Sequence, residues 1–273
     1  MKKVLTISAL VLAGSGIFAQ DDAVSKNVRF GLKVTPSVNW LKSENEKLQS
    51  GNGAAMKFGG GVILEFRLAK VASIQTGLQI DMDGGKIKYT NDGSNEVRYF
   101  YHNIDEEIVE YNAEYENNPD YTHYQLDERK YNITYVTLPV ALKLKTKEIG
   151  ALTYFGQVGL NTSFRWKASA NDEVSSLETS AKVKESKSKI DITKDVNIFN
   201  FALNAGLGAE YNISGSTSIL FGLSYNLGFS NVVKKKSDYL ERKVTSATFT
   251  ETYSDYPQEL KSNAVVLTIG VLF

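Results

Sequence analysis

The sequence predicts an all-β protein: an eight-stranded antiparallel up-and-down transmembrane β-barrel with long extracellular hairpin loops. The first observation is the C-terminal segment, which alternates apolar and small or polar residues and ends on an aromatic side chain. Its apolar side carries Val265, Leu267, Ile269, Val271 and Phe273. The second observation is that seven earlier segments alternate with the same two-residue period. The third is a secretory signal at the N-terminus.

Residues 1–19 have the pattern of a cleaved signal peptide. The basic residues Lys2 and Lys3 precede an apolar stretch from Val4 to Phe18, and Ala19 offers a small residue for cleavage. This stretch is too short to span a bilayer, which disfavours an uncleaved anchor helix. We therefore expect a periplasmic N-terminal segment at 20–27 and the barrel at 28–273.

Composition excludes several classes of protein. The chain has 273 residues, with 31 Lys and Arg, 31 Asp and Glu, and no Cys. Because basic residues are not in excess, the composition gives no sign of nucleic-acid binding. The lack of Cys excludes disulfides and lipid attachment at Cys. Beyond the signal no apolar run of about 18 residues occurs, so a membrane helix is excluded, whereas a membrane barrel with alternating strands is not.

The alternation predicts where the strands and connections lie. The eight strands cover about 29–40, 57–68, 74–82, 131–145, 152–166, 199–211, 218–229 and 263–273. Short connections fall near 69–70, 146–150 and 212–215, and long polar ones near 41–56, 83–130, 168–195 and 231–262. Short periplasmic turns alternating with long extracellular loops are typical of outer-membrane barrels, and an even strand count places both termini in the periplasm.

One face of the strands must point outward. An eight-stranded interior is only wide enough for side chains to fill it, so the bulky apolar face does not fit inside. This argues against a soluble, lipocalin-like barrel and for a lipid-facing exterior. We expect a polar interior in which Arg67, Arg165 and Lys33 pair with Glu65, Glu210 and Asp81. Aromatic residues gather at both strand ends, as in interfacial girdles: Trp40, Trp166, Phe199, Phe229, Phe30, Tyr154, Tyr211 and Phe273.

Two prolines interrupt the alternation. Pro36 and Pro139 lie inside predicted strands, where a closed barrel has no free edge for a residue without an N–H. We expect a bulge or local break at each. The strand around Pro139 also has the least polar inner face, because Ile133, Tyr135 and Ala141 point the same way as Pro139.

Several short motifs together resemble the PorT-like outer-membrane β-barrel family of Bacteroidota. They are Phe18-Ala19-Gln20, the strand Gly31 to Pro36, Tyr135-Val-Thr-Leu-Pro139-Val, Gly156-Gln-Val-Gly159 and the terminal Phe273. The resemblance implies an outer-membrane barrel over essentially the whole mature chain. Some members of that family are implicated in secretion across the outer membrane, but these motifs specify the barrel rather than a task.

The candidate catalytic residues are few. His102 and His123 are the only histidines and lie in the long segment 83–130, near Asp105, Glu106 and Glu107. No motif ties a nucleophile to a base, so we predict no catalytic residues and no enzyme. Asp81-Met-Asp83-Gly84 lacks the spacing of a calcium loop, so we predict no metal site and no cofactor.

Charged and aromatic residues in the loops favour binding. Lys182, Lys184, Lys187, Lys189, Lys234 to Lys236, Arg242 and Lys243 could contact lipopolysaccharide phosphates. Ordinary charge mixing with Glu185, Asp191, Asp238 and Glu241 is the favoured alternative.

We expect a binding or assembly component of the bacterial cell envelope, including as an accessory of a secretion or uptake machine. Its partners would be outer-membrane lipid and lipopolysaccharide, other envelope proteins or surface glycan, and the barrel-assembly machinery during insertion. The alternatives are a rim-located enzyme acting on lipid or peptide, and a narrow channel, which a side-chain-filled lumen disfavours.

Overall fold

The computed structural model describes residues 27–92, 95–110, 112–116, 118–177, 183–245 and 251–273. The predicted signal peptide and almost all of the segment 20–27 lie outside these residues. Within them are seventeen strands and a 3₁₀ turn at Ala113–Tyr115. The strands are β1 (Val28–Val34), β2 (Ser37–Ser43), β3 (Gln49–Gly51), β4 (Ala55–Lys57), β5 (Gly59–Ala69), β6 (Ala72–Asp83), β7 (Lys86–Tyr89), β8 (Asn95–His102), β9 (Glu107–Val109), β10 (Tyr121–Lys145), β11 (Leu152–Ser176), β12 (Lys184–Asp191), β13 (Phe199–Ser214), β14 (Thr217–Gly228), β15 (Lys236–Thr245), β16 (Glu251–Pro257) and β17 (Leu260–Leu272). In this part of the chain, no helix has the length and apolarity to cross a membrane.

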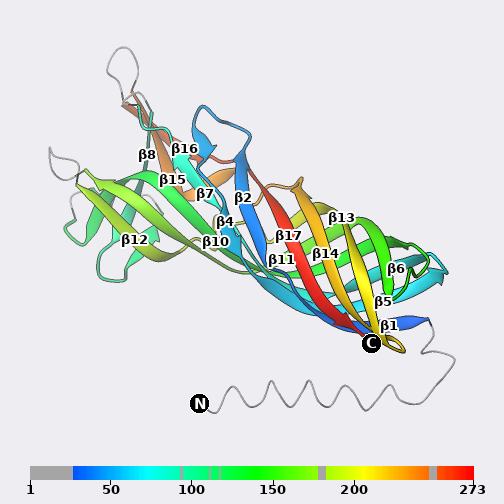
Figure 1. Ribbon diagram of the computed structural model, residues 1–273. Helices are drawn as coiled ribbons and strands as arrows, with labels where there is room; N and C mark the ends of the chain where they lie inside the picture. The colour runs from blue at the N-terminus through cyan, green and yellow to red at the C-terminus, as the bar shows by residue number, and fades with distance from the viewer. Residues whose placement is uncertain (1–26, 93–94, 111, 117, 178–182, 246–250) are drawn as a thin grey trace, which may run out of the picture.

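Eight of the strands pair in a closed ring. The order is β1, β5, β6, β10, β11, β13, β14 and β17, every pairing is antiparallel, and β17 returns to β1 with Gly31 opposite Leu272. Figure 1 shows the first and last strands side by side. The predicted all-β, antiparallel organisation is confirmed. The chain as a whole has more strands than the eight expected, because long segments predicted as loops are themselves β-structure.

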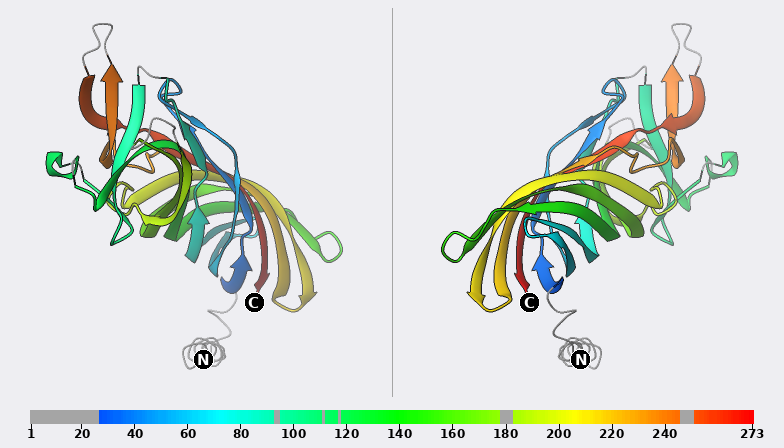
Figure 2. Two further views of the ribbon diagram at one scale, coloured as in Figure 1. Left: turned by 90° about the vertical axis from the view of Figure 1, so that its left-hand side faces the viewer. Right: turned by 90° about the vertical axis from the view of Figure 1, so that its right-hand side faces the viewer.

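The two ends of the ring differ in their connections. At the turn end, short links join β5 to β6, β10 to β11 and β13 to β14, and Gly215 adopts the left-handed φ of 57° in the last of them. At the distal end, β10 and β11 continue together past the ring with β7, β8, β12, β15 and β16 (Figure 1). The two side views of Figure 2 show these strands rising beyond the ring. We call this part the distal extension.

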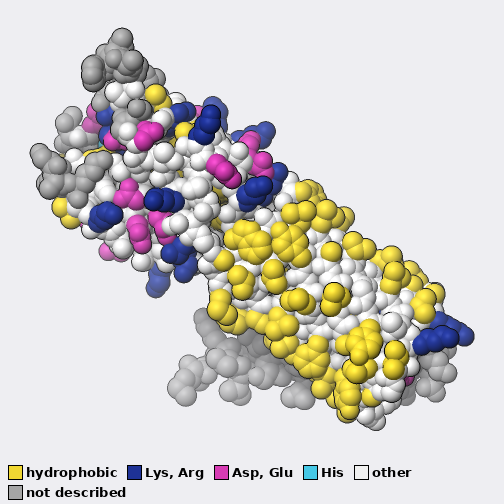
Figure 3. Space-filling view, turned by 45° about the horizontal axis from the view of Figure 1, so that its top comes forward, with side chains coloured by type: hydrophobic (Ala, Val, Ile, Leu, Met, Phe, Trp, Pro, Cys, Tyr) yellow, Lys and Arg dark blue, Asp and Glu magenta, His cyan; other side chains and the backbone are white. Residues whose placement is uncertain are grey.

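Side-chain chemistry inverts between the ring and the distal extension. On β10 the outward residues Leu138, Val140, Leu142 and Leu144 are exposed, while Thr137 and Lys143 point inward and are buried. Further up the same strand the inward residues become apolar, namely Tyr131, Ile133 and Tyr135, and the outward ones become polar. The space-filling view shows the outcome, an apolar band on one half and mixed charges on the other (Figure 3). The predicted outward direction of the apolar face is therefore confirmed within the ring.

A β-bulge marks this boundary on β11. The pairing runs from Thr134 opposite Lys167 directly to Tyr135 opposite Arg165, which leaves Trp166 as the extra residue. The bulge shifts the side-chain alternation by one residue. Leu160 and Phe164 therefore face outward below it, whereas Ala168 and Ala170 are buried above it. Trp166 itself is 72% exposed, which suits the predicted aromatic belt at this level.

The interior of the ring near the turn end is filled by an ion network. Lys143 Nζ lies 3.0 Å from Glu65 Oε2 and 2.5 Å from Glu210 Oε1, and Arg29 Nη1 lies 2.6 Å from Glu210 Oε2. Lys145 also contacts both carboxylates. The Lys143 ammonium stands 4.1 Å from the centre of the Phe155 ring, which adds a cation–π contact.

The predicted interior pairs were largely wrong. Arg67 is exposed at the turn end, and the guanidinium of Arg165 donates to the backbone carbonyls of Thr193 and Val196. Lys33 is within electrostatic range of Asp81 but has no carboxylate oxygen within 4.0 Å among the described residues. Glu65 and Glu210 pair instead with Arg29, Lys143 and Lys145, because register and depth along the axis decide which inward side chains meet.

The two prolines behave differently. At Pro36 the strand breaks as predicted, since β1 ends at Val34 and β2 begins at Ser37. At Pro139 the strand continues without a bulge, and only the ladder to β6 is interrupted between Thr137–Gln79 and Val140–Thr76. Thr76 Oγ1 donates to the Pro139 carbonyl at 2.8 Å. The missing N–H of Pro139 therefore interrupts only the pairing of β10 with β6, and the register of both pairings is kept.

Candidate functional site in the distal extension

The distal extension has its own hydrophobic core. Its sheet contains the upper parts of β10 and β11 flanked by β12 on one side and by β8, β15 and β16 on the other. The inward face buries a continuous set of apolar and aromatic side chains, including Tyr99, Leu126, Tyr131, Val174, Ile190, Leu240 and Tyr256. These segments were predicted as long polar hairpin loops. Hairpins are present, as in the β11–β12 and β15–β16 pairs, but they surround an apolar core that the prediction did not include. A packed core makes the extension a defined surface rather than a set of independent loops.

A cluster of stacked rings lies on the opposite face of the same sheet. Phe100 and His123 are cross-strand partners whose rings stack at 4.2 Å with an interplanar angle of 9°. Tyr115, from the 3₁₀ turn, stacks on Tyr121 at 3.9 Å, and His102 stacks on Tyr121 at 4.6 Å. Such contacts hold the 3₁₀ turn against this face of the sheet. We call these five residues the aromatic cluster. We call the described residues 103–110, 112–116 and 118–120 the covering segment.

The two candidate catalytic histidines both belong to the aromatic cluster. His102 Nδ1 lies 2.8 Å from Asp105 Oδ2, and Glu107 is the cross-strand partner of His102, whereas Glu106 is exposed. His123 is half-buried, and its Nε2 has no hydrogen-bond partner among the described residues. Burial, followed by the nearby charges of Arg98 and Lys243, lowers the pKa of His123 to about 4. His123 is therefore uncharged at neutral pH.

This arrangement supplies a His–Asp pair but no paired nucleophile. Within the residues that the structure describes, no Ser or Thr hydroxyl donates to either imidazole. A nucleophilic mechanism needs a hydroxyl or thiol within hydrogen-bond reach of the base. The sequence has no Cys to serve that role.

Glu241 is a residue whose behaviour the sequence did not reveal. It lies directly opposite Arg98 in the β15–β8 pairing, and its Oε2 is buried without a hydrogen-bond partner in the described chain. Burial, followed by the negative charge of Glu116, raises the pKa of the Glu241 carboxyl to about 7. The sequence presented Glu241 only as part of a mixed-charge loop, because no local pattern shows which loop acids become buried.

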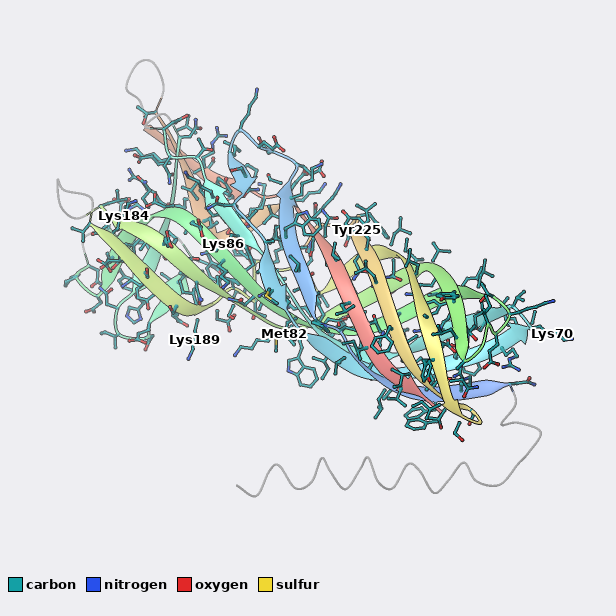
Figure 4. The ribbon with its side chains drawn as sticks, in the orientation of Figure 1. Lys70, Met82, Lys86, Lys184, Lys189 and Tyr225 are labelled. Carbon is teal, nitrogen blue, oxygen red and sulfur yellow. The ribbon has the colours of Figure 1, made fainter. Side chains whose placement is uncertain are left out.

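Several basic residues of the distal extension have acidic partners. Lys187 Nζ is 3.1 Å from Glu185 Oε2 and stands over the rings of Tyr101 and Tyr124 at 4.7 and 4.9 Å. Further pairs join Lys234 to Asp238 at 2.6 Å and Lys236 to Asp255 at 3.1 Å. Figure 4 shows Lys184 and Lys189 near opposite ends of β12 in the distal extension, and both side chains are exposed. Lys182 lies outside the described residues.

In the described segments, no group of three or more His, Asp or Glu side chains is arranged to hold a metal ion. The acidic side chains Glu106, Glu114 and Asp120 are exposed and spread along the covering segment.

A closed antiparallel ring with an apolar exterior and a polar, ion-paired interior defines the class of membrane β-barrels. The chain matches the family model of the outer membrane protein β-barrel domain over residues 18–234, and it belongs to that family. Its location is therefore the bacterial outer membrane. The assignment rests on this family match.

Solved structures show a distant likeness to the same class. The outer membrane protein OprG of Pseudomonas aeruginosa is 8% identical, with 90% of this chain and 96% of that chain covered and a TM-score of 0.43. A major outer membrane protein of Thermus thermophilus is 10% identical, with 90% and 98% covered and a TM-score of 0.39. Neisserial surface protein A is 7% identical, with 89% and 95% covered and a TM-score of 0.37. No curated protein matches the sequence.

Proposed function

We propose that the protein is an eight-stranded outer-membrane barrel that acts through its distal extension as a binding or assembly component of the cell envelope. The observation that carries this proposal is the combination of a filled lumen with an extension that has its own packed core. The ion network of Lys143, Glu65 and Glu210 occupies the turn end, and the core around Tyr131 and Tyr256 closes the distal end. What remains available for interaction is the outer surface of the extension.

The proposed orientation places the distal extension outside the cell and both termini in the periplasm. The short turns at one end and the long β-structure at the other support it, because outer-membrane barrels carry their long hairpins outside. The lack of Cys in the chain allows a clean test by single-cysteine labelling. On intact cells a membrane-impermeant maleimide should label Ser188→Cys in β12 but not Ser216→Cys at the turn end, both of which are exposed sites. Labelling of Ser216→Cys alone would reverse the orientation.

The proposed partners are lipopolysaccharide, surface glycan or another envelope protein, including a secretion or uptake machine. The exposed lysines of β12 and the belt residue Trp166 support contact with lipid and its phosphates. The narrower membership in the PorT-like family of Bacteroidota is supported by the motifs around Pro36 and Pro139. Insertion would use the barrel-assembly machinery.

Binding can be separated from transport and from catalysis. Purified protein in planar bilayers should show no steady conductance, and purified lipopolysaccharide should bind more weakly when Lys184 and Lys189 are replaced by Ala. The matched control replaces Lys70, which Figure 4 shows at the turn end. Steady conductance would instead support the narrow channel.

The alternative of a different class is a rim-located enzyme, and the specific observation that favours it is the His102–Asp105 contact of 2.8 Å. Replacing both histidines by Gln separates the two functions. A binding barrel should keep its cellular phenotype, whereas a lipid- or peptide-modifying enzyme should lose it.

A further inference from the structure

A small polar cavity lies inside the ring, just below the distal extension. Its volume is about 60 Å³, which is room for about two waters or for one ion and a water. The lining is rich in oxygen atoms and includes Thr35, Asn39, Gln79, Asp81, Asp83 and Tyr135. These side chains come from β6, from β10 and from the chain around the break at Pro36.

Three of the lining side chains carry a buried oxygen atom without a partner. They are Thr35 Oγ1, Gln79 Oε1 and Tyr135 OH, and none of them has a hydrogen-bond partner among the described residues. The side chains are almost fully enclosed, with relative exposures of 4%, 7% and 1%. Buried polar atoms are normally satisfied, so three unsatisfied oxygens around one cavity indicate that something polar occupies it.

The two carboxylates of the cavity lack a contacting cation. Asp83 Oδ1 accepts hydrogen bonds from Asn39 Nδ2 at 2.8 Å and Ser262 Oγ at 2.7 Å, and Asp81 Oδ2 accepts one from Gln79 Nε2 at 2.5 Å. No Lys or Arg nitrogen of the described chain lies within 4.0 Å of either.

Two lysines act on these carboxylates only at longer range. Lys33 acts electrostatically on Asp81, and Lys57 on Asp83. Lys57 Nζ is directed elsewhere, 2.7 Å from Asn132 Oδ1. Neither lysine therefore fills the place of a contacting cation.

Gly59 leaves open a small space between Asp81 and Thr35, two residues that line the cavity. A Cβ at this position would collide with Asp81 Oδ1 and would lie 2.6 Å from Thr35 Oγ1. These two oxygens, one from β6 and one from the break at Pro36, therefore face the same small space. Only a residue without a side chain leaves that space free.

We propose that this cavity binds a hard cation, with Ca²⁺ as the best match to its oxygens. Asp81 and Asp83 would supply the negative charge, and Thr35, Gln79 and Tyr135 would supply neutral oxygens, with water completing the six to eight ligands that Ca²⁺ takes. Gln79, Asp81 and Asp83 alternate along β6, while Thr35 and Tyr135 come from the break at Pro36 and from β10. This strand arrangement differs from a calcium loop, in which one short loop supplies the ligands. The ion stabilises the junction where β2 and β17 meet β6 through the bonds of Asp83 to Asn39 and Ser262.

This site is independent of the proposed binding function, and Ca²⁺ alone tests it. The full chain in detergent micelles is stripped with a chelator and titrated with Ca²⁺ by calorimetry, with thermal unfolding measured in parallel. The wild type should bind one ion per chain and unfold at a higher temperature with Ca²⁺. Asp81→Asn should lower the affinity at least tenfold, and Gly59→Ala should do the same by filling the space.

Two further variants guard against a folding defect. Tyr135→Phe removes only an unpartnered hydroxyl, so it should fold normally and bind Ca²⁺ several-fold more weakly. Asp105→Asn, in the acidic covering segment, should leave the affinity unchanged. Absence of a saturable site in the wild type, or binding that survives in folded Tyr135→Phe and Asp81→Asn alike, would show that the cavity holds water only.

Discussion

The Arg129 guanidinium and the Asp172 carboxylate form a fully buried bidentate pair in the core of the distal extension. Arg129 Nε and Nη2 donate to the two carboxylate oxygens at 2.8 and 2.7 Å, and the residues are directly opposite each other on β10 and β11. Both side chains have 0% exposure. The pair therefore fixes the register of the two strands that carry the extension above the ring.

Breaking this pair should destabilise the extension strongly. Arg129→Ala or Asp172→Ala leaves one buried charge without its partner, which typically costs about 3–5 kcal/mol. Denaturant unfolding followed by tyrosine fluorescence measures the change. The double variant Arg129→Met with Asp172→Leu should recover most of the loss, because no charge is then left buried. A single variant as stable as the wild type would contradict the assignment.

The direction of the ring side chains can be tested at adjacent positions of β11. Leu160 is exposed on the apolar band, whereas Asn161 points inward and its Nδ2 donates to Asn226 Oδ1 at 3.2 Å. Leu160→Arg should cost about 2–4 kcal/mol in a bilayer, because it places a charge at the lipid-facing midplane. Asn161→Arg should cost less, since the interior already holds ionised groups. Equal losses of stability for the two variants, measured by refolding into lipid vesicles, would disprove the assignment of Leu160 to the outer face and Asn161 to the inner face.

Lys143 should be essential for the interior of the ring. It contacts both Glu65 and Glu210 and is completely buried. Lys143→Met removes the fully buried cation of the network and should cost about 3–5 kcal/mol, because Lys145 and Arg29, which are less buried, then have to balance two neighbouring carboxylates. Lys145→Met, whose side chain is more exposed, is the matched control with a smaller expected loss. Urea unfolding in micelles gives the comparison, and a larger loss for Lys145→Met would contradict it.

The stability of the extension should fall as pH rises through neutrality because of Glu241. Its folded-state pKa of about 7 lies above the ordinary value of 4.5, so the folded protein holds the proton more tightly. The stabilising contribution is full below 4.5 and is lost as pH rises to about 7. Glu241→Gln should abolish this part of the pH dependence, measured by protease resistance of the extension. An unchanged profile in the variant would assign the effect to another group.

His123, opposite in effect to Glu241, should make the stability of the extension fall as the pH is lowered. Its folded-state pKa of about 4 lies below the ordinary 6.5, so folding favours the neutral ring stacked on Phe100. Its contribution is full above 6.5 and is lost as pH falls towards about 4. His123→Phe keeps the stacking and removes the titration, so the variant should resist acid better than the wild type in near-ultraviolet circular dichroism. Equal acid sensitivity would argue against this role.

The ring could be predicted from the sequence because the bilayer imposes a strict period on it. Leu138, Val140 and Leu142 alternate with buried residues over a long stretch, and that pattern needs no knowledge of the neighbours. The distal extension was missed because its cross-strand partners are far apart in the chain. Arg98 faces Glu241, a separation that no local pattern reports.

The candidate site shows the same limit. The sequence correctly grouped His102 with Asp105, since both lie in one short segment. It could not place His123 against Phe100, or find the partners of Glu65 and Glu210, because these depend on register between distant strands. The inversion of side-chain alternation at Trp166 also escaped prediction, since one inserted residue is invisible until the partner strand is known.

The seam between β1 and β17 joins the first strand of the ring to its last. Closure therefore has to wait until the last strand has left the ribosome and crossed the periplasm. Until then the nascent sheet has two unprotected borders that any other extended chain could join. A variant truncated before Leu260 would keep both borders permanently, on β14 and on β1, and should accumulate as degraded or aggregated material rather than in the outer membrane.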